Sequence, residues 1–294
     1  MPELPEVETI ARNLATQLPG CQILAVEKLD WERMVETPSL PLFQSTLPGR
    51  CVQGVGRRAK WLLLLLDGGW TLALHLRMSG RVGVSGSNPS ADRHTHLVLA
   101  LDDGRRFLGF RDPRKFGRVR LLDAGGFTKL HTAYGPEPLS DQFRPADLAH
   151  ILSTHHTRLK PLLLNQAVLA GLGNIYVDEA LWLAGLHPLR CSTTLTFTEG
   201  SHLHAAIRSV LTAAIQRGGS TLRDYRDGYG ERGHNQEYFS VYRRTGQPCP
   251  RCGTPIERIR VAQRGTHLCP VCQPAAPATH SPIHPSPPHS PHSH

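Results

Sequence analysis

The chain opens with Met1-Pro2-Glu3-Leu4-Pro5-Glu6-Val7-Glu8, and the rest of the sequence is organised around this stretch. Removal of Met1, which the small Pro2 permits, exposes a secondary amine of a type that is partly uncharged near neutral pH. Such an amine attacks carbonyl-like carbons to form iminium intermediates, which divides one difficult bond cleavage into two easier steps. Glu3 lies beside that nitrogen, within reach for proton transfer. The stretch therefore predicts a nucleophile with an adjacent proton donor or acceptor.

The same residues also have a purely structural interpretation. Proline and glutamate are common in the first turn of a helix, where a carboxylate interacts favourably with the helix dipole. Leu4, Val7, Ile10 and Leu14 follow at helical spacing, which predicts a helix that ends near residues 18–20. Only the rest of the chain decides between the two interpretations.

Composition indicates a polyanionic partner. The 294 residues are enough for about two domains, and the formal net charge is +9. An excess of positive charge suits nucleic acid. Most of that charge is arginine, whose planar guanidinium makes bidentate contacts with phosphate, although a GC-rich genome also favours arginine.

No apolar run approaches the roughly 20 residues that a bilayer crossing needs, and the N-terminus lacks the pattern of a secretory signal. We therefore expect a cytoplasmic protein with no membrane partner, associated with the nucleoid if its partner is DNA. Four of the seven cysteines form two C-x2-C pairs, and Cys21, Cys51 and Cys191 are expected to be buried thiols.

Strand patterns dominate the first part of the chain. Residues 60–66 and 70–76 flank Asp67-Gly68-Gly69 and predict a hairpin, and residues 96–101 and 106–110 predict a second. Further short apolar segments occupy residues 23–29 and 51–54. Residues 1–130 are therefore predicted to form a helix-led β-sandwich or barrel domain.

Helical periodicity follows, at residues 146–153, 159–166, 174–184 and 200–217, which places a helical domain at residues 131–240. Within it, residues 218–238 are rich in glycine and charge and predict a mobile loop. Residues 274–294 are rich in histidine, proline and serine and can bury almost nothing, so a disordered tail is expected.

Between these segments, residues 241–273 contain a metal-binding pattern. Cys249-x2-Cys252 and Cys269-x2-Cys272 have the spacing of a four-thiolate zinc site, with two short strands between the pairs. Four thiolates leave no open coordination position, so one structural Zn²⁺ is expected. A disulfide pair or free thiols is the alternative, which a reducing compartment disfavours. The basic hairpin is expected to grip nucleic acid.

Four motifs in this order resemble formamidopyrimidine-DNA glycosylase, of the bacterial Fpg/MutM family in the Fpg/Nei superfamily. They are MPELPEVE, DPRKFG at residues 112–117, GLGNIY at residues 171–176, and the CxxC pairs with AQRGT between them. The resemblance spans residues 1–273. It implies an α+β fold: an N-terminal helix with a β-sandwich domain, then a helical helix-two-turn-helix domain with a zinc-finger β-hairpin.

The resemblance also implies an activity. The family enzymes are bifunctional: they excise oxidised purines such as 8-oxoguanine and formamidopyrimidines, then cleave the abasic strand by β,δ-elimination. By motif, Pro2 attacks C1′ and Glu3 transfers protons. Lys60 contacts a phosphate near the lesion and assists catalysis. Arg264 of AQRGT is implied in phosphate binding and the final elimination.

Further residues are implied in DNA binding. Met78, Arg114 and Phe116 match the residues that fill the gap left when a nucleotide rotates out of the helix, which costs a few kcal/mol. We expect the glycines and amides of GLGNIY to face a phosphate, with Asn174 binding a phosphate oxygen while it caps a helix. His94 and Lys160 occupy further DNA-contacting positions.

Some positions depart from common family patterns. Arg77 and Arg243 stand where many members have glycine, and His155-His156 replaces a basic run ahead of Lys160. The arginines are candidates for added phosphate contacts, whereas the histidine pair puts one expected contact in doubt.

Two rivals to this activity stay open. One is an endonuclease VIII-like glycosylase for oxidised pyrimidines, disfavoured by Leu4, where that branch usually has glycine. The other is a zinc-containing protein that binds damaged DNA without cutting it. The predicted partner is in each case double-stranded DNA with a lesion or an abasic site, bound by a monomer.

Overall fold

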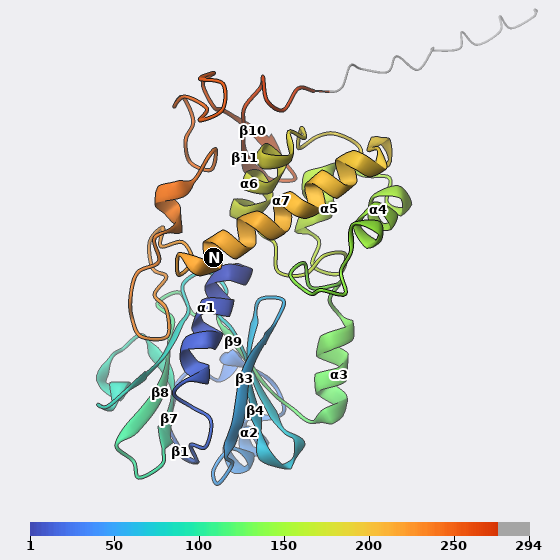
Figure 1. The fold of residues 1–294 in the computed structure, drawn as a ribbon. Helices are drawn as coiled ribbons and strands as arrows, with labels where there is room; N and C mark the ends of the chain where they lie inside the picture. The colour runs from blue at the N-terminus through green and yellow to red at the C-terminus, as the bar shows by residue number, and fades with distance from the viewer. Residues whose placement is uncertain (276–294) are drawn as a thin grey trace, which may run out of the picture.

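A computed structural model describes residues 1–275, in which a β-rich part and a helical part meet at the N-terminal helix (Figure 1). The predicted disordered tail, residues 274–294, lies almost entirely outside the described residues. Helix α1 (Leu4–Ala15) begins as predicted, with the backbone N–H of Glu3 donating to Glu6 Oε2 at 2.8 Å. Leu4 packs into the core of the helical part, whereas Val7, Ile10 and Leu14 pack into the β-rich core. The first helix therefore joins the two cores.

The β-rich part consists of two sheets. Its strands are β1 (Ile23–Leu29), β2 (Val35–Thr37), β3 (Val52–Arg58), β4 (Trp61–Leu66), β5 (Thr71–His75), β6 (Arg81–Ser85), β7 (Thr95–Leu101), β8 (Arg106–Arg111) and β9 (Arg118–Leu122). The order β1-β7-β8-β6 forms one sheet, and β2-β9-β5-β4-β3 forms the other. Apolar side chains from both sheets share one core, so the predicted sandwich is confirmed.

Both predicted hairpins are present. Strands β4 and β5 pair antiparallel with Trp61 opposite His75, and β7 pairs antiparallel with β8. Three strands of three to five residues each were not predicted from the sequence, namely β2, β6 and β9. Strand β5 is equally short, but it was predicted because it follows the apolar run of β4 across a glycine turn, and none of these three strands has such a neighbour. Helices α2 (Leu40–Thr46) and α3 (Ala124–Thr132) were also not predicted.

The helical part contains α4 (Pro145–Thr154), α5 (Leu159–Leu164), α6 (Asn174–Ala184) and α7 (Phe197–Gln216). Helix α7 begins three residues before the predicted start, because the Thr196 hydroxyl accepts from the Glu199 N–H while the Glu199 carboxylate accepts from the Thr196 N–H. This reciprocal cap ends the preceding loop. Short 3₁₀ turns complete the chain, at η1 (Glu32–Met34), η2 (Asp67–Gly69), η3 (Pro89–Ala91), η4 (Ser192–Thr194) and η5 (Asn235–Tyr238).

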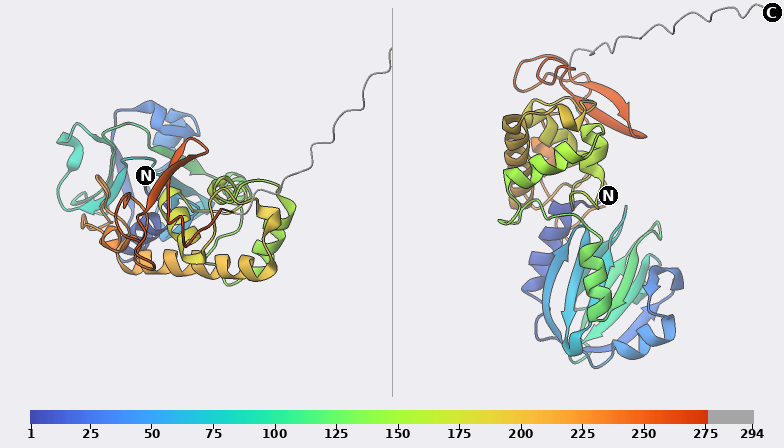
Figure 2. Two further views of the ribbon diagram at one scale, coloured as in Figure 1. Left: turned by 90° about the horizontal axis from the view of Figure 1, so that it is seen from above. Right: turned by 90° about the vertical axis from the view of Figure 1, so that its right-hand side faces the viewer.

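Strands β10 (Glu257–Val261) and β11 (Arg264–Leu268) form the predicted C-terminal hairpin. Its two turn residues, Ala262 and Gln263, both have positive φ, as a two-residue turn between twisted strands requires. In the right-hand view of Figure 2, the hairpin and the N-terminus lie on the same side of the molecule. No helix among residues 1–275 combines the length and apolarity needed to cross a bilayer.

Residues 218–234 run beside α1 with little regular structure. Tyr225 is buried, and its hydroxyl donates to the Gly218 carbonyl at 3.0 Å. The Gly228 N–H donates to Asn13 Oδ1, and the Tyr229 hydroxyl lies 2.7 Å from Thr16 Oγ1. The predicted loop is therefore held along the helix that begins beside Pro2, while its predicted mobility stays a prediction.

Candidate active site

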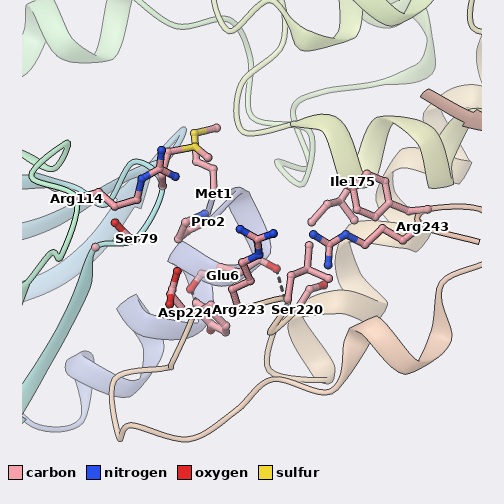
Figure 3. Close-up of a pocket in the computed structure, with 15 residues that line it drawn as sticks. Met1, Pro2, Glu6, Ser79, Arg114, Ile175, Ser220, Arg223, Asp224 and Arg243 are labelled. Atoms are coloured by element: carbon pink, nitrogen blue, oxygen red, sulfur yellow. Dashed lines mark hydrogen bonds between the residues drawn. The ribbon is translucent and has the colours of Figure 1, made fainter. Parts of the chain in front are cut away.

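Pro2 lies where the two parts of the molecule meet, between two cavities. The first has a volume of about 560 Å³ and is lined by Pro2, Glu6, Arg114, Ser220 and Arg223, among others (Figure 3). The second, of about 500 Å³, is lined by Glu3, Lys60, His75, Asn174 and Arg264, among others. Met1, Met78, Ile175, Leu222 and Tyr242 line both cavities. Removal of Met1 therefore exposes the Pro2 nitrogen at the boundary between them.

The carboxylate of Glu3 sits at the start of helix α6. Its Oε1 accepts the Ile175 N–H at 3.1 Å and its Oε2 accepts the Tyr176 N–H at 3.4 Å, and the side chain is only 3% exposed. Burial raises the pKa of Glu3 above its ordinary value, although the nearby Lys60 charge and the helix amides oppose that rise. Glu3 is therefore a carboxyl group suited to hold and release a proton beside Pro2.

This arrangement corrects the expectation for GLGNIY. The free amides at the start of α6 bind the Glu3 carboxylate, which takes the place we had predicted for a phosphate. A Cβ at Gly173 would lie 2.2 Å from Glu3 Cδ, and one at Gly171 would lie 2.5 Å from Leu4 Cδ1. The two glycines therefore let α6 approach the N-terminal segment closely.

Asn174 likewise differs from its predicted role as a cap, because the N-cap of α6 is Gly173. Its Nδ2 donates instead to the Gly265 carbonyl at 3.0 Å, at the tip of the zinc hairpin. Its Oδ1 is buried and has no hydrogen-bond partner within residues 1–275. Because Asn174 lines the second cavity, phosphate binding stays a prediction for this side chain.

Glu6 connects three segments at the first cavity. It accepts hydrogen bonds from the Tyr176 hydroxyl at 2.5 Å, from the Ser220 N–H at 2.8 Å and from the Glu3 N–H. Burial and the adjacent Glu6 charge raise the pKa of Tyr176 well above its ordinary value, so the phenol remains a donor. The sequence analysis assigned Glu6 only to the first helical turn, whereas it also anchors the loop at Ser220.

Lys60 lines the second cavity, at the turn into β4, while its predicted phosphate contact and catalytic role stay predictions. Its Nζ donates to the Leu172 carbonyl at 2.7 Å, and the side chain is nearly buried. Burial and, secondarily, the Arg264 charge lower the pKa of Lys60, while the Glu3 charge opposes that shift. The two cations therefore share one cavity with the Glu3 carboxylate.

Lys160 does not lie on the DNA-binding surface, so its predicted position is wrong. The side chain is 0% exposed, and its Nζ pairs with Asp178 Oδ1 at 2.5 Å. The same Nζ lies 3.3 Å from the Gly265 carbonyl, and Asp178 Oδ2 accepts the His267 N–H. A buried, paired ammonium group is not available to a phosphate, and Lys160 instead fixes the hairpin that carries Arg264.

Met78, Arg114 and Phe116 project from neighbouring loops beside the first cavity. Met78 and Phe116 are each 44% exposed, which excludes core packing, and the Arg114 guanidinium lies 4.8 Å from the centre of the Phe116 ring. Asp112 connects the loops, because Oδ1 accepts from the Ser79 hydroxyl and Oδ2 from the Phe116 N–H. This geometry supports their predicted insertion into DNA.

His94 lies outside both cavities. It is half-buried, and its carbonyl accepts the Asp112 N–H at 2.7 Å, so it lies beside the DPRKFG loop. Contact between His94 and DNA therefore stays a prediction.

Three successive segments match family models: the formamidopyrimidine-DNA glycosylase N-terminal domain at residues 1–119, the H2TH domain of the same enzyme at residues 134–226, and the zinc finger found in FPG and IleRS at residues 246–275. The chain is 59% identical over 273 residues to the formamidopyrimidine-DNA glycosylase of Roseiflexus sp. strain RS-1, covering 93% of this chain and 100% of the relative. The chain belongs to the formamidopyrimidine-DNA glycosylase family.

Other relatives agree with this assignment. The formamidopyrimidine-DNA glycosylase of Chloroflexus aggregans is 58% identical, with 93% of this chain and 98% of the relative covered. Among solved structures, a Lactococcus lactis FPG mutant in complex with Fapy-dG DNA is 38% identical with a TM-score of 0.86. MutM in complex with carbocyclic 8-oxo-G DNA is 37% identical with the same TM-score, and both cover 93% of this chain and all of the solved chain.

The cysteine cluster fits the structural zinc of this formamidopyrimidine-DNA glycosylase family member. The Sγ atoms of Cys249, Cys252, Cys269 and Cys272 all lie within 4.8 Å of one another. A tetrahedral ion with four Zn–S bonds of about 2.3 Å places its sulfurs about 3.8 Å apart. Two observed Sγ pairs, at 3.4 and 3.9 Å, bracket that spacing. Cys51 and Cys191 are half-buried, so the prediction of buried thiols holds only for Cys21.

Sequence analysis of this glycosylase family member missed His75, which lines the second cavity and is 8% exposed. Its Nδ1 accepts the Arg77 N–H at 3.1 Å, which leaves Nε2 as the protonated nitrogen. Burial, together with the charges of Arg77 and Lys60, lowers the pKa of His75 to about 3. A lone histidine in an apolar strand resembles a core residue, and the only signal was its position three residues before Met78.

His75 should make the stability of this glycosylase pH-dependent. Folded His75 stays neutral down to pH of about 3, whereas an unfolded histidine protonates below about pH 6.5, so stability declines as pH falls through this window. We expect His75→Gln to reduce the decline by up to about 1.4 kcal/mol per pH unit between pH 6 and 4. Urea unfolding across this range measures the effect. The exposed His202→Gln is the control, and equal slopes for the two variants would contradict the prediction.

Proposed function

We propose that this protein is a bifunctional DNA glycosylase and abasic-site lyase of base excision repair. Its substrate is double-stranded DNA that contains oxidised purines, such as 8-oxoguanine and formamidopyrimidines. The observation that carries the proposal is the position of Pro2 between two cavities, with the buried Glu3 carboxyl beside it and cations around both. All of these groups come from one chain, which supports a monomer. Because its substrate is genomic DNA, the protein works in the cytoplasm, at the nucleoid.

The reaction begins at the Pro2 nitrogen once Met1 is removed. The nitrogen attacks C1′ of the flipped nucleotide, and the glycosidic electron pair leaves with the base, which takes up a proton. Glu3, whose raised pKa allows it to carry a proton, assists base loss and opening of the sugar ring. The C1′–O4′ bond then breaks as the proton of the Pro2 nitrogen is transferred by Glu3 to O4′, which leaves an iminium ion between Pro2 and C1′.

Strand cleavage follows from the acidity of that iminium. Loss of a C2′ proton expels the 3′ phosphate, and a second elimination expels the 5′ phosphate. Lys60 and Arg264 line the second cavity, where they can bind a phosphate and stabilise its charge as it leaves. Cys249, Cys252, Cys269 and Cys272 would hold a zinc ion with four thiolates, which would leave no open coordination position for bond cleavage and would stabilise the hairpin that carries Arg264.

Borohydride trapping tests this proposal. On an 8-oxoguanine duplex, protein without Met1 should form a covalent adduct that peptide mass spectrometry maps to Pro2, and Pro2→Gly should suppress it strongly. Protein that retains Met1 is the control, because its Pro2 nitrogen belongs to a peptide bond. An absent adduct would favour the DNA-binding rival, and preferential adduct formation on oxidised pyrimidines would favour the endonuclease VIII-like rival.

A further inference from the structure

Arg243 adopts a backbone conformation that normally requires glycine. Its φ is +61°, in the left-handed region that non-glycine residues avoid. Strained residues of this kind persist where the surrounding structure holds them, and they cluster at functional sites. A contact of the Arg243 side chain would account for arginine in this conformation.

The segment that leads to Arg243 is firmly held. The buried carboxylate of Glu179, on helix α6, accepts the backbone N–H groups of Ser240, Val241 and Tyr242 at 2.8, 3.0 and 2.8 Å. Three consecutive bonds to one carboxylate define the path of the chain up to Arg243. Its backbone is therefore anchored at the edge of the first cavity.

The side chain of Arg243 extends into that cavity. Figure 3 shows it reaching toward Ser220 and Arg223, while Arg114 lies on the opposite side of Pro2. Within residues 1–275 its guanidinium group forms neither an ion pair nor a hydrogen bond, and Arg243 is exposed. Its hydrogen-bond donors are therefore free for a ligand.

The charges around the cavity favour an anion. Arg114, Arg223 and Arg243 line it, and the carboxylates among its lining residues are Glu6 and Asp224. Glu6 is occupied by Tyr176, Ser220 and its own helix start, and Asp224 lies 3.9 Å from the Arg81 guanidinium. The three arginines therefore exceed the carboxylates that could neutralise them, and arginine is well suited to bidentate contact with phosphate.

We infer that Arg243, at the edge of the first cavity, binds a backbone phosphate of the damaged strand, in addition to the phosphate expected at Lys60 and Arg264 in the second cavity. The inference rests on the proposed function, since it assumes that damaged DNA lies across both cavities. The strand would then be contacted from both cavities. The left-handed backbone conformation is less favourable for arginine than for glycine, and the phosphate contact offsets this cost.

Salt-dependent binding of the Arg243→Gly variant tests the inference. Loss of one phosphate contact should lower the slope of log K against log salt by about 0.9 and weaken binding by several-fold at low salt. The loss should be equal for an 8-oxoguanine duplex and for a duplex with a tetrahydrofuran abasic analogue, because both have the phosphate. Glycine suits the left-handed backbone, so the melting temperature should stay equal or rise.

Arg243→Asn provides a second variant, since asparagine also tolerates positive φ, and it should match the glycine variant in binding. Arg105→Gly is the charge control: Arg105 is exposed in the β7–β8 turn, at the opposite end of these strands from the DPRKFG loop. An unchanged slope for both Arg243 variants would overturn the inference. A loss confined to the 8-oxoguanine duplex would also overturn it, because that result indicates contact with the base. Trapping by the wild-type protein tests the proposed function separately.

Discussion

Glu3→Gln is expected to slow excision of 8-oxoguanine by about 10²–10⁴-fold, the usual contribution of a positioned proton donor or acceptor. The buried carboxyl has a raised pKa and lies beside Pro2, whereas an amide cannot exchange the proton. Strand cleavage at a preformed abasic site should decrease much less, since the base is already gone and the sugar presents an aldehyde. Single-turnover assays on both duplexes measure this difference.

The helix start should survive this substitution, because its cap uses the backbone N–H of Glu3 and the side chain of Glu6. Glu8→Gln is the matched control on the same helix, since Glu8 pairs with Arg12 and Arg57 and lines neither of the two cavities. Excision by Glu3→Gln within tenfold of the wild-type rate would refute the assigned role. So would equal losses on the two substrates.

Loss of zinc is expected to slow strand cleavage strongly. Structural zinc contributes about 10–16 kcal/mol of apparent binding free energy in zinc-finger peptides, so a short hairpin does not keep its shape without the ion. Arg264 is the first residue of β11 and reaches the second cavity only because the hairpin is folded. Removing this one electrostatic contact should reduce turnover by about 10²–10³-fold, with weaker DNA binding.

Cys252→Ser, or treatment with a chelator, tests this prediction by zinc content, melting temperature and cleavage of an abasic duplex. Cys51→Ser is the matched control, because Cys51 is half-buried and lies outside the cluster. Full activity in protein shown to lack zinc would mean that the hairpin folds without the metal.

The arrangement of residues that depends on local spacing could be predicted from the sequence. Four cysteines at fixed intervals define a zinc site wherever they lie, and Pro2 with Glu3 are adjacent by covalent connection. Lys160 was placed wrongly because its environment is not determined by local spacing. It occupies a family motif, but whether a lysine meets solvent or an aspartate depends on distant segments, here Asp178 and the carbonyl of Gly265. The capping role of Asn174 was wrong for the same reason, because the partner of its side chain lies 91 positions along the chain.

The sequence alone determined the helix that begins at Leu4, the two long hairpins and the zinc ligands, because period, turn chemistry and covalent spacing are local properties. Only the tertiary structure decided which charged groups are free for DNA. Burial and neighbouring charges set the proton affinity of Glu3, Lys60 and His75, and these depend on how α1, α6 and β11 pack together. Arg243 depends on packing as well, since its left-handed backbone, and a guanidinium without a partner among residues 1–275, become visible only in the folded chain.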